Sequence, residues 1–185
     1  MRRLRGLQRA AQAAVIPVST LVLGGARSGK SAHAESLLAG GPALYLATGQ
    51  AFDGEMAERI AAHRSRRGPD WSTVEEPLAL AEALERALHP DRPVLVDCLT
   101  LWISNLMHAG RDVDRETARL CEVLSDPAGA VVLVSNEVGL GLVPETPLGR
   151  AFRDAQGRVN QRVAQACRRV VFVAAGLPLV LKDQT

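Results

Sequence analysis

The chain contains Gly24-Gly25-Ala26-Arg27-Ser28-Gly29-Lys30-Ser31, which matches the P-loop pattern G-x-x-x-x-G-K-[ST] at every fixed position. A short aliphatic and β-branched run, residues 18–23, precedes this stretch, and residues 32–38 have the composition of a helix. A strand, a glycine loop and a helix in this order are the context that a P-loop requires. The sequence therefore predicts a nucleoside triphosphate site. A chance match in a glycine-rich turn is the less favoured interpretation.

The residue types of this stretch fit phosphate chemistry. Glycines allow backbone N–H groups to close around phosphate oxygens, and the start of the following helix adds a partial positive charge. Lys30 is expected to reach the β- and γ-phosphates, and the Ser31 hydroxyl is expected to bind Mg²⁺.

Composition limits the classes of protein that this chain can belong to. Its 185 residues are enough for one domain with a sizeable core. The hydrophobic fraction is 47% but the aromatic fraction only 3%, so Ala, Val and Leu must form that core. The net charge of +2 implies no strong nucleic-acid or membrane partner. No apolar run reaches the length of a membrane span.

The two ends of the chain differ in character. Residues 1–17 begin with clustered arginines and are expected to form a flexible basic extension, and residues 18–185 are expected to form a single domain. A signal peptide is not expected, because the first apolar run is the P-loop strand itself.

The three cysteines, Cys98, Cys121 and Cys167, are far apart and form no C-x-x-C pair. This pattern predicts a reducing, cytoplasmic location and no zinc site.

Strand and helix patterns alternate along the chain. Strands are predicted at 43–47, 94–97, 130–135 and 170–174 in addition to 18–23, and helices at 54–66, 78–88, 99–108, 114–124 and 148–168. The tail, 176–182, is expected to add a last strand or hairpin near an edge. This alternation predicts an α/β fold with a mostly parallel sheet flanked by helices. Ligands bind at the carboxyl ends of strands in such sheets. Polar residues and one glycine end or follow several predicted strands: Thr48, Gly49, Asp97, Ser135, Asn136 and Glu137.

Asp97 ends an aliphatic strand, which is the Walker B position where a carboxylate helps to hold Mg²⁺. The alternative interpretation is a helix N-cap for the segment that starts at Leu99. One residue could serve both purposes, and the P-loop favours the metal role.

Two further residues have possible chemical roles. His63 lies in a basic segment and could act as a base or nucleophile, although the residues alone favour a surface histidine. Glu75 could accept hydrogen bonds from the two N–H groups of guanine, although its local pattern favours an ordinary exposed glutamate.

On helix 148–168, one face carries the polar residues Arg150, Asp154, Arg158 and Gln161. That face is either solvated or turned toward substrate or a neighbouring subunit.

Seven segments taken together resemble one family, the bifunctional adenosylcobinamide kinase / adenosylcobinamide-phosphate guanylyltransferase of cobalamin assembly. They are GGARSGKS (24–31), YLAT (45–48), D-x-E-M-x-x-R-I-x-x-H-R (53–64), W-x-T-V-E-E-P (71–77), DCLTLW-x-SN (97–105), SNEVGLG (135–141) and FRD-x-x-G-x-x-NQR (152–162). The resemblance covers about residues 21–182. A P-loop alone is unspecific, whereas all seven segments in order are very specific.

The resemblance implies two reactions. The family phosphorylates the aminopropanol hydroxyl of adenosylcobinamide with a nucleoside triphosphate, ATP or GTP. It then takes GMP from GTP onto a histidine and passes it to the cobinamide phosphate, giving adenosylcobinamide-GDP. The matching histidine is His63, so the resemblance reverses the interpretation that the residues alone favour. It also implies a RecA-like P-loop NTPase fold and a homo-oligomer, with a trimer as one form.

The resemblance further implies which residues bind nucleotide and metal. Phosphates are expected at Gly24, Gly25, Ala26, Arg27, Ser28, Gly29, Lys30 and Ser31, with Mg²⁺ at Ser31 and Asp97. The remaining GTP contacts are expected at Ala47, Thr48, Gly49, Arg64, Ser65, Arg66, Arg67 and Glu75. Two other functions stay open at this point. A plain P-loop kinase would leave His63 inert, and a nucleotide-gated binding protein would perform no transfer.

Overall fold

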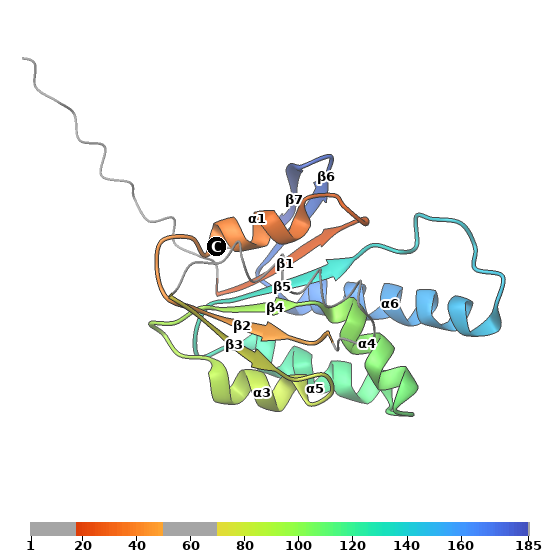
Figure 1. The fold of residues 1–185 in the computed structure, drawn as a ribbon, viewed down its shortest axis with the longest axis horizontal. Helices are drawn as coiled ribbons and strands as arrows, with labels where there is room; N and C mark the ends of the chain where they lie inside the picture. The colour runs from red at the N-terminus through yellow and green to blue at the C-terminus, as the bar shows by residue number, and fades with distance from the viewer. Residues whose placement is uncertain (1–17, 50–69, 185) are drawn as a thin grey trace, which may run out of the picture.

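The computed structural model describes residues 18–49 and 70–184. Its centre is a seven-stranded sheet with the strand order β3-β2-β4-β5-β1-β6-β7 (Figure 1). The strands are β1 (Ser19–Gly24), β2 (Ala43–Ala47), β3 (Trp71–Glu75), β4 (Val94–Asp97), β5 (Val131–Asn136), β6 (Arg169–Ala174) and β7 (Leu177–Asp183). All neighbours pair in parallel except β6 and β7, which are antiparallel. The carboxyl ends of six strands therefore meet at one edge.

Helices cover both faces of the sheet. Helix α1 (Lys30–Leu37) lies on one face, where Ala34 packs with Val22, Leu95 and Val132. The other face is covered by α3 (Leu80–Ala87), α4 (Leu99–His108), α5 (Val113–Ser125) and α6 (Pro147–Ala166), as Figure 1 shows. Because both faces are covered, the central strands are buried along nearly their whole length.

The helix ends follow from local sequence. Asp112 caps α5 by accepting hydrogen bonds from the backbone N–H groups of Asp114 (3.0 Å) and Arg115 (3.1 Å). Thr146 caps α6 through the N–H of Gly149 (3.1 Å), and Pro147 occupies the first turn. No helix in the described part of the chain is long and apolar enough to cross a bilayer.

The predicted α/β fold, with a mostly parallel RecA-like sheet flanked by helices, is confirmed. Strands 43–47 and 94–97 and helix 99–108 have the predicted bounds, and the other described elements shift by one or two residues at their ends. The tail forms an edge strand, as expected. Strand β3 was not predicted as a strand. Helix 54–66 and the extension 1–17 lie outside the described residues, so those predictions stay predictions.

Candidate active site at the carboxyl edge of the sheet

The P-loop connects Gly24, the last residue of β1, to Lys30 at the start of α1. Arg27 (φ 55°) and Gly29 (φ 94°) have left-handed backbone conformations, which let the loop turn back on itself. Gly29 is the N-cap of α1 and provides no side-chain hydrogen bond to the helix. A glycine here leaves the N–H groups of the first turn without a side-chain cap, and the phosphate site expected at them stays a prediction.

The loop packs closely against its surroundings. A Cβ on Gly24 would lie 2.5 Å from Ser28 Oγ and 2.6 Å from the carbonyl oxygen of Val173, so no other residue fits without displacement. The backbone N–H of Gly176 donates to the carbonyl oxygen of Ser28 at 2.8 Å. The turn between β6 and β7 therefore holds the tip of the P-loop, a contact that the sequence analysis did not anticipate.

Lys30 begins α1 and is half-buried. Its ammonium donates a hydrogen bond to the carbonyl oxygen of Gly25 at 3.1 Å. Burial lowers the pKa of Lys30, and the nearby Cys98 and Asp97 act in the opposite direction. The ammonium thus lies in a partly desolvated place close to Asp97. A bound phosphate would stabilise its charged form there.

Asp97 is the last residue of β4, and it is paired in register with Ala47 of β2 and Val134 of β5. The N-cap of α4 is Cys98, which makes no side-chain capping bond. The alternative interpretation of Asp97 as an N-cap is therefore wrong. Burial raises the pKa of the neighbouring Cys98 thiol to about 12, so this thiol stays protonated beside Asp97.

Thr48 holds the turn that follows Asp97. The residue is 0% exposed, and its hydroxyl donates to the carbonyl oxygen of Cys98 (2.7 Å) and accepts from the Cys98 N–H (2.9 Å). Its backbone N–H donates to the carbonyl oxygen of Asp97 at 3.2 Å, and its own carbonyl oxygen accepts from the Asn105 amide at 2.7 Å. All its polar groups are thus used within the protein. The GTP contact expected at Thr48 stays a prediction.

The remaining described candidates lie along the same edge. Ala47 ends β2, where its carbonyl oxygen accepts from the N–H of Glu76 at 2.9 Å, and Gly49 follows two residues later. Glu75 ends β3 and is exposed. Four strand spacings, about 19 Å in total, separate β3 from the P-loop strand β1. A nucleotide that joins the two would have to lie along the edge of the sheet.

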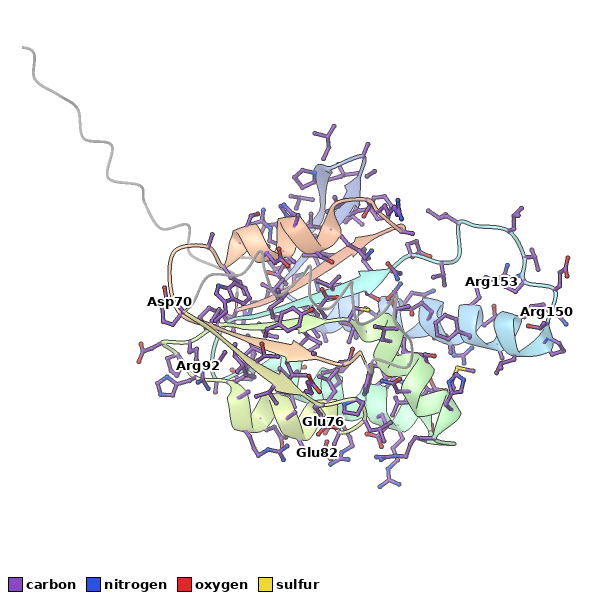
Figure 2. All side chains as sticks on the ribbon, viewed as in Figure 1. Asp70, Glu76, Glu82, Arg92, Arg150 and Arg153 are labelled. Atoms are coloured by element: carbon purple, nitrogen blue, oxygen red, sulfur yellow. The ribbon has the colours of Figure 1, made fainter. Side chains whose placement is uncertain are left out.

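The candidate nucleophile His63 and the nucleotide contacts Arg64, Ser65, Arg66 and Arg67 lie outside the described residues. The described chain stops at Gly49, beside the carboxyl edge, and resumes at Asp70 immediately before β3. Figure 2 shows Asp70 together with Arg92 at the opposite end of the sheet from Arg150 and Arg153.

A buried polar cluster that the sequence analysis did not predict supports the end of β5. Ser135 Oγ donates to Asn160 Oδ1 at 2.7 Å, and Gln156 Nε2 donates to both oxygens, at 2.9 and 3.0 Å. Asn160 Nδ2 then donates to the carbonyl oxygen of Asn136 at 3.0 Å. The available signals were that Ser135 and Asn136 come at the end of an aliphatic strand and that Asn160 lies in a segment that resembles the family.

The polar face predicted on α6 is mainly solvated. Arg150, Asp154, Arg158 and Gln161 are all exposed. Arg158 pairs with Asp114 of α5 at 3.9 Å, and Arg162 pairs with the same carboxylate at 3.5 Å. Exposed pairs of this kind contribute little to stability.

Residues 20–181 match the family model described as cobinamide kinase / cobinamide phosphate guanyltransferase. The chain belongs to this family. The predicted resemblance is thereby confirmed, and as a member of the cobinamide kinase / cobinamide phosphate guanyltransferase family the protein is an enzyme.

Curated relatives agree with the family match. The bifunctional adenosylcobalamin biosynthesis protein CobP of Pseudomonas aeruginosa is 50% identical over 168 residues, which cover 89% of this chain and 97% of the relative. CobU of Escherichia coli, described in the same words, is 43% identical over 178 residues, which cover 88% and 98%. A solved structure from Pyrococcus horikoshii OT3 has a TM-score of 0.55 at 9% identity, covering 92% of this chain and 88% of its own, and shares the fold alone.

Proposed function

We propose that the protein phosphorylates adenosylcobinamide with a nucleoside triphosphate and then transfers GMP from GTP to adenosylcobinamide phosphate through a guanylyl-histidine at His63. One observation supports this most strongly. In a chain of the cobinamide kinase / guanyltransferase family, the fold brings the Lys30 ammonium and Asp97 together beside an open helix N-terminus. This arrangement fits a triphosphate. The family description names cobinamide and cobinamide phosphate, which we take as the acceptors.

In the first step, the substrate hydroxyl oxygen bonds to the γ-phosphorus. The bond between that phosphorus and the β–γ bridging oxygen breaks, the nucleoside diphosphate leaves with the electron pair, and the hydroxyl proton is lost to solvent. Lys30 and the backbone N–H groups at the start of α1 stabilise the negative charge on the phosphates.

In the second step, an imidazole nitrogen of His63 bonds to the α-phosphorus of GTP and pyrophosphate leaves. A phosphate oxygen of adenosylcobinamide phosphate then bonds to the same phosphorus as the P–N bond breaks. The product is adenosylcobinamide-GDP, and the histidine is regenerated. Covalent transfer of this kind replaces one difficult displacement with two easier ones.

The residues at the edge also fit Mg²⁺. Mg²⁺ is usually held by one or two protein ligands together with substrate phosphates and waters. Asp97 and the half-buried Ser31 offer one carboxylate and one hydroxyl. The described residues form no larger cluster of three or more metal-ligating side chains. We infer that these two residues hold Mg²⁺ when nucleotide binds, where the cation would neutralise phosphate charge.

We also propose that the protein is a homo-oligomer, as the family resemblance implies. Two groups of large apolar side chains are exposed. One lies on β7, with Leu177 at 72%, Leu179 at 60% and Leu181 at 57% exposure. The other follows β5, with Leu140 at 81% and Leu142 at 96%. A second copy of the chain would remove such surface from water.

Covalent labelling tests the guanylyl-histidine. The protein is incubated with GTP labelled at the α-phosphate and Mg²⁺, denatured, and examined for retained label. We expect label that is acid-labile and alkali-stable, that is lost in His63→Ala and that persists in the matched control His89→Ala, an exposed histidine on another segment. Absence of label from protein that binds GTP would exclude the guanylyl-histidine.

The kinase step is tested separately with GTP or ATP labelled at the γ-phosphate and adenosylcobinamide as acceptor. Lys30→Met removes the ammonium and is expected to lower the rate at least about 100-fold, because a phosphate-stabilising donor is lost. Arg86→Met removes an exposed cation on α3 and serves as the matched control. A wild-type rate in Lys30→Met would contradict the proposed P-loop chemistry.

A further inference from the structure

Asn136 lies at the carboxyl end of the strand that separates the P-loop strand from the Asp97 strand. It is the last residue of β5, the strand between β1 and β4 (Figure 1). In the parallel register, Asn136 pairs with Gly24, the first residue of the P-loop. Asp97 pairs with Val134, two residues earlier on the same strand. Asn136 is thus the neighbour of both candidate phosphate-binding segments.

Strand alternation shows on which face of the sheet Asn136 lies. Val132 and Val134 pack in the cluster that contains Ala34 of α1. Side chains two residues apart in a strand lie on the same face, so Asn136 lies on the α1 face as well. Leu95 belongs to that cluster too, which places Asp97 on this face. The P-loop lies above the same face, since a Cβ on Gly24 would meet Ser28 Oγ.

The backbone of Asn136 is held rigidly. Its N–H donates to Thr100 Oγ1 at 2.9 Å, and its carbonyl oxygen accepts from Asn160 Nδ2 at 3.0 Å. The next N–H, of Glu137, donates to the carbonyl oxygen of Gly24 at 3.1 Å. Helix α4, helix α6 and strand β1 thus fix the position of this one residue.

The side chain of Asn136 is not satisfied in the same way. Its Oδ1 atom is buried and accepts no hydrogen bond from residues 18–49 or 70–184. In the P-loop, Ser28 Oγ is buried and equally without a partner within those residues. Buried polar atoms without partners are rare in folded proteins and are costly to stability. Two of them beside the P-loop indicate that these groups serve a polar ligand.

We propose that the Asn136 carboxamide contacts the terminal phosphate of the bound nucleoside triphosphate and is a catalytic residue of the phosphoryl-transfer step. Its amide nitrogen donates to a γ-phosphate oxygen, and its amide oxygen accepts from a donor on the ligand side, a bound water or the acceptor hydroxyl. A carboxamide suits this position because it carries a donor and an acceptor without adding negative charge beside Asp97. The inference rests on the proposed nucleotide site at the P-loop.

The test compares triphosphate and diphosphate binding without any corrinoid. Affinities for the β,γ-imido analogue of GTP and for GDP are measured by calorimetry, with and without magnesium chloride, for wild type, Asn136→Ala and Asn136→Asp. We expect about tenfold or greater loss of triphosphate affinity in Asn136→Ala and a larger loss in Asn136→Asp, which adds a like charge. Affinity for GDP should change by less than about twofold in Asn136→Ala.

A thermal melt of each variant separates contact from structure. The expected melting temperature of Asn136→Ala is equal to or above that of wild type, because a buried acceptor without a partner is removed. Gln165→Ala, an exposed amide on α6, is the matched control and should change no affinity.

Equal losses for GTP analogue and GDP, or an unchanged triphosphate affinity, would overturn the proposal. Because these measurements need neither His63 nor a corrinoid, they stand apart from the proposed function. A selective triphosphate loss in a protein that forms no guanylyl-histidine would support Asn136 while the proposed function failed.

Discussion

The hydroxyl of Thr48 holds the backbone together at the carboxyl edge of the sheet. It joins the ends of β2 and β4 through two hydrogen bonds to the backbone of Cys98. The P-loop and Asp97 could be predicted from a motif and from a strand end. The role of Thr48 could not, because its partner is 50 positions away in the chain. Only the tertiary fold shows that Thr48 is placed to position Asp97.

Thr48→Val keeps the shape of the side chain but removes the hydroxyl. We expect the free energy of unfolding to fall by about 2–3 kcal/mol, because two buried backbone groups of Cys98 lose their partner. Urea denaturation measures the change, and Thr73→Val, an exposed threonine on β3, is the control. Weaker GTP binding without loss of stability would instead support the direct contact expected from sequence.

His33 of α1 is predicted to make stability depend on pH. Partial burial and then the charge of Arg169 lower the pKa of His33. The unfolded chain therefore binds this proton more tightly than the folded protein does. The stability that neutral His33 contributes is fully present above the pKa of the unfolded chain, near 6.5. It is lost as the pH falls through the lower pKa of the folded protein.

The predicted result is a smaller loss of unfolding free energy between about pH 7 and pH 5 in His33→Gln than in wild type. Urea titrations at a series of pH values measure this slope. Parallel slopes for wild type and His33→Gln would rule out this titration as a cause.

Among the elements, burial decided which strands could be predicted. Strands β2 and β4 are mostly apolar and nearly wholly buried, and both have their predicted bounds. Strand β3 was missed because it is an edge strand whose residues, from Ser72 to Glu75, are all exposed. Its side chains show no apolar alternation, so only its pairing with β2 makes it a strand. Helix α5 begins one residue before the predicted start because Asp112 caps it.

The contact between α6 and β5 depends on the cluster of Ser135, Gln156 and Asn160. Asn160→Ala is expected to lower the free energy of unfolding by about 2–4 kcal/mol, because the Ser135 hydroxyl hydrogen loses its acceptor and the Asn136 carbonyl oxygen loses its donor. Gln161→Ala changes the next residue, which is exposed, and should cost less than about 0.5 kcal/mol. Urea denaturation compares the two, and equal effects would mean that the cluster is not cooperative.

At the scale of the whole molecule, the exposed leucines of β7 lead to a prediction about assembly. If a second copy covers them, Leu179→Glu places a charge in an apolar interface and should shift the protein toward monomers. Light scattering coupled to size-exclusion chromatography measures the mass. Ala39→Glu, an exposed position after α1, is the control. A wild-type mass unaffected by Leu179→Glu would place the interface elsewhere.

The position of β1 in the sheet has a consequence for synthesis on the ribosome. This strand is translated before the other described elements, yet its two neighbours are β5 and β6, and the turn at Gly176 holds the tip of its P-loop. A nascent chain that lacks residues 131–176 has the whole P-loop motif but lacks both strand neighbours of β1 and the Gly176 contact. Competence to bind a triphosphate must therefore arise late, when nearly all of the described chain has emerged, so incomplete chains would not withdraw nucleotide from the cell.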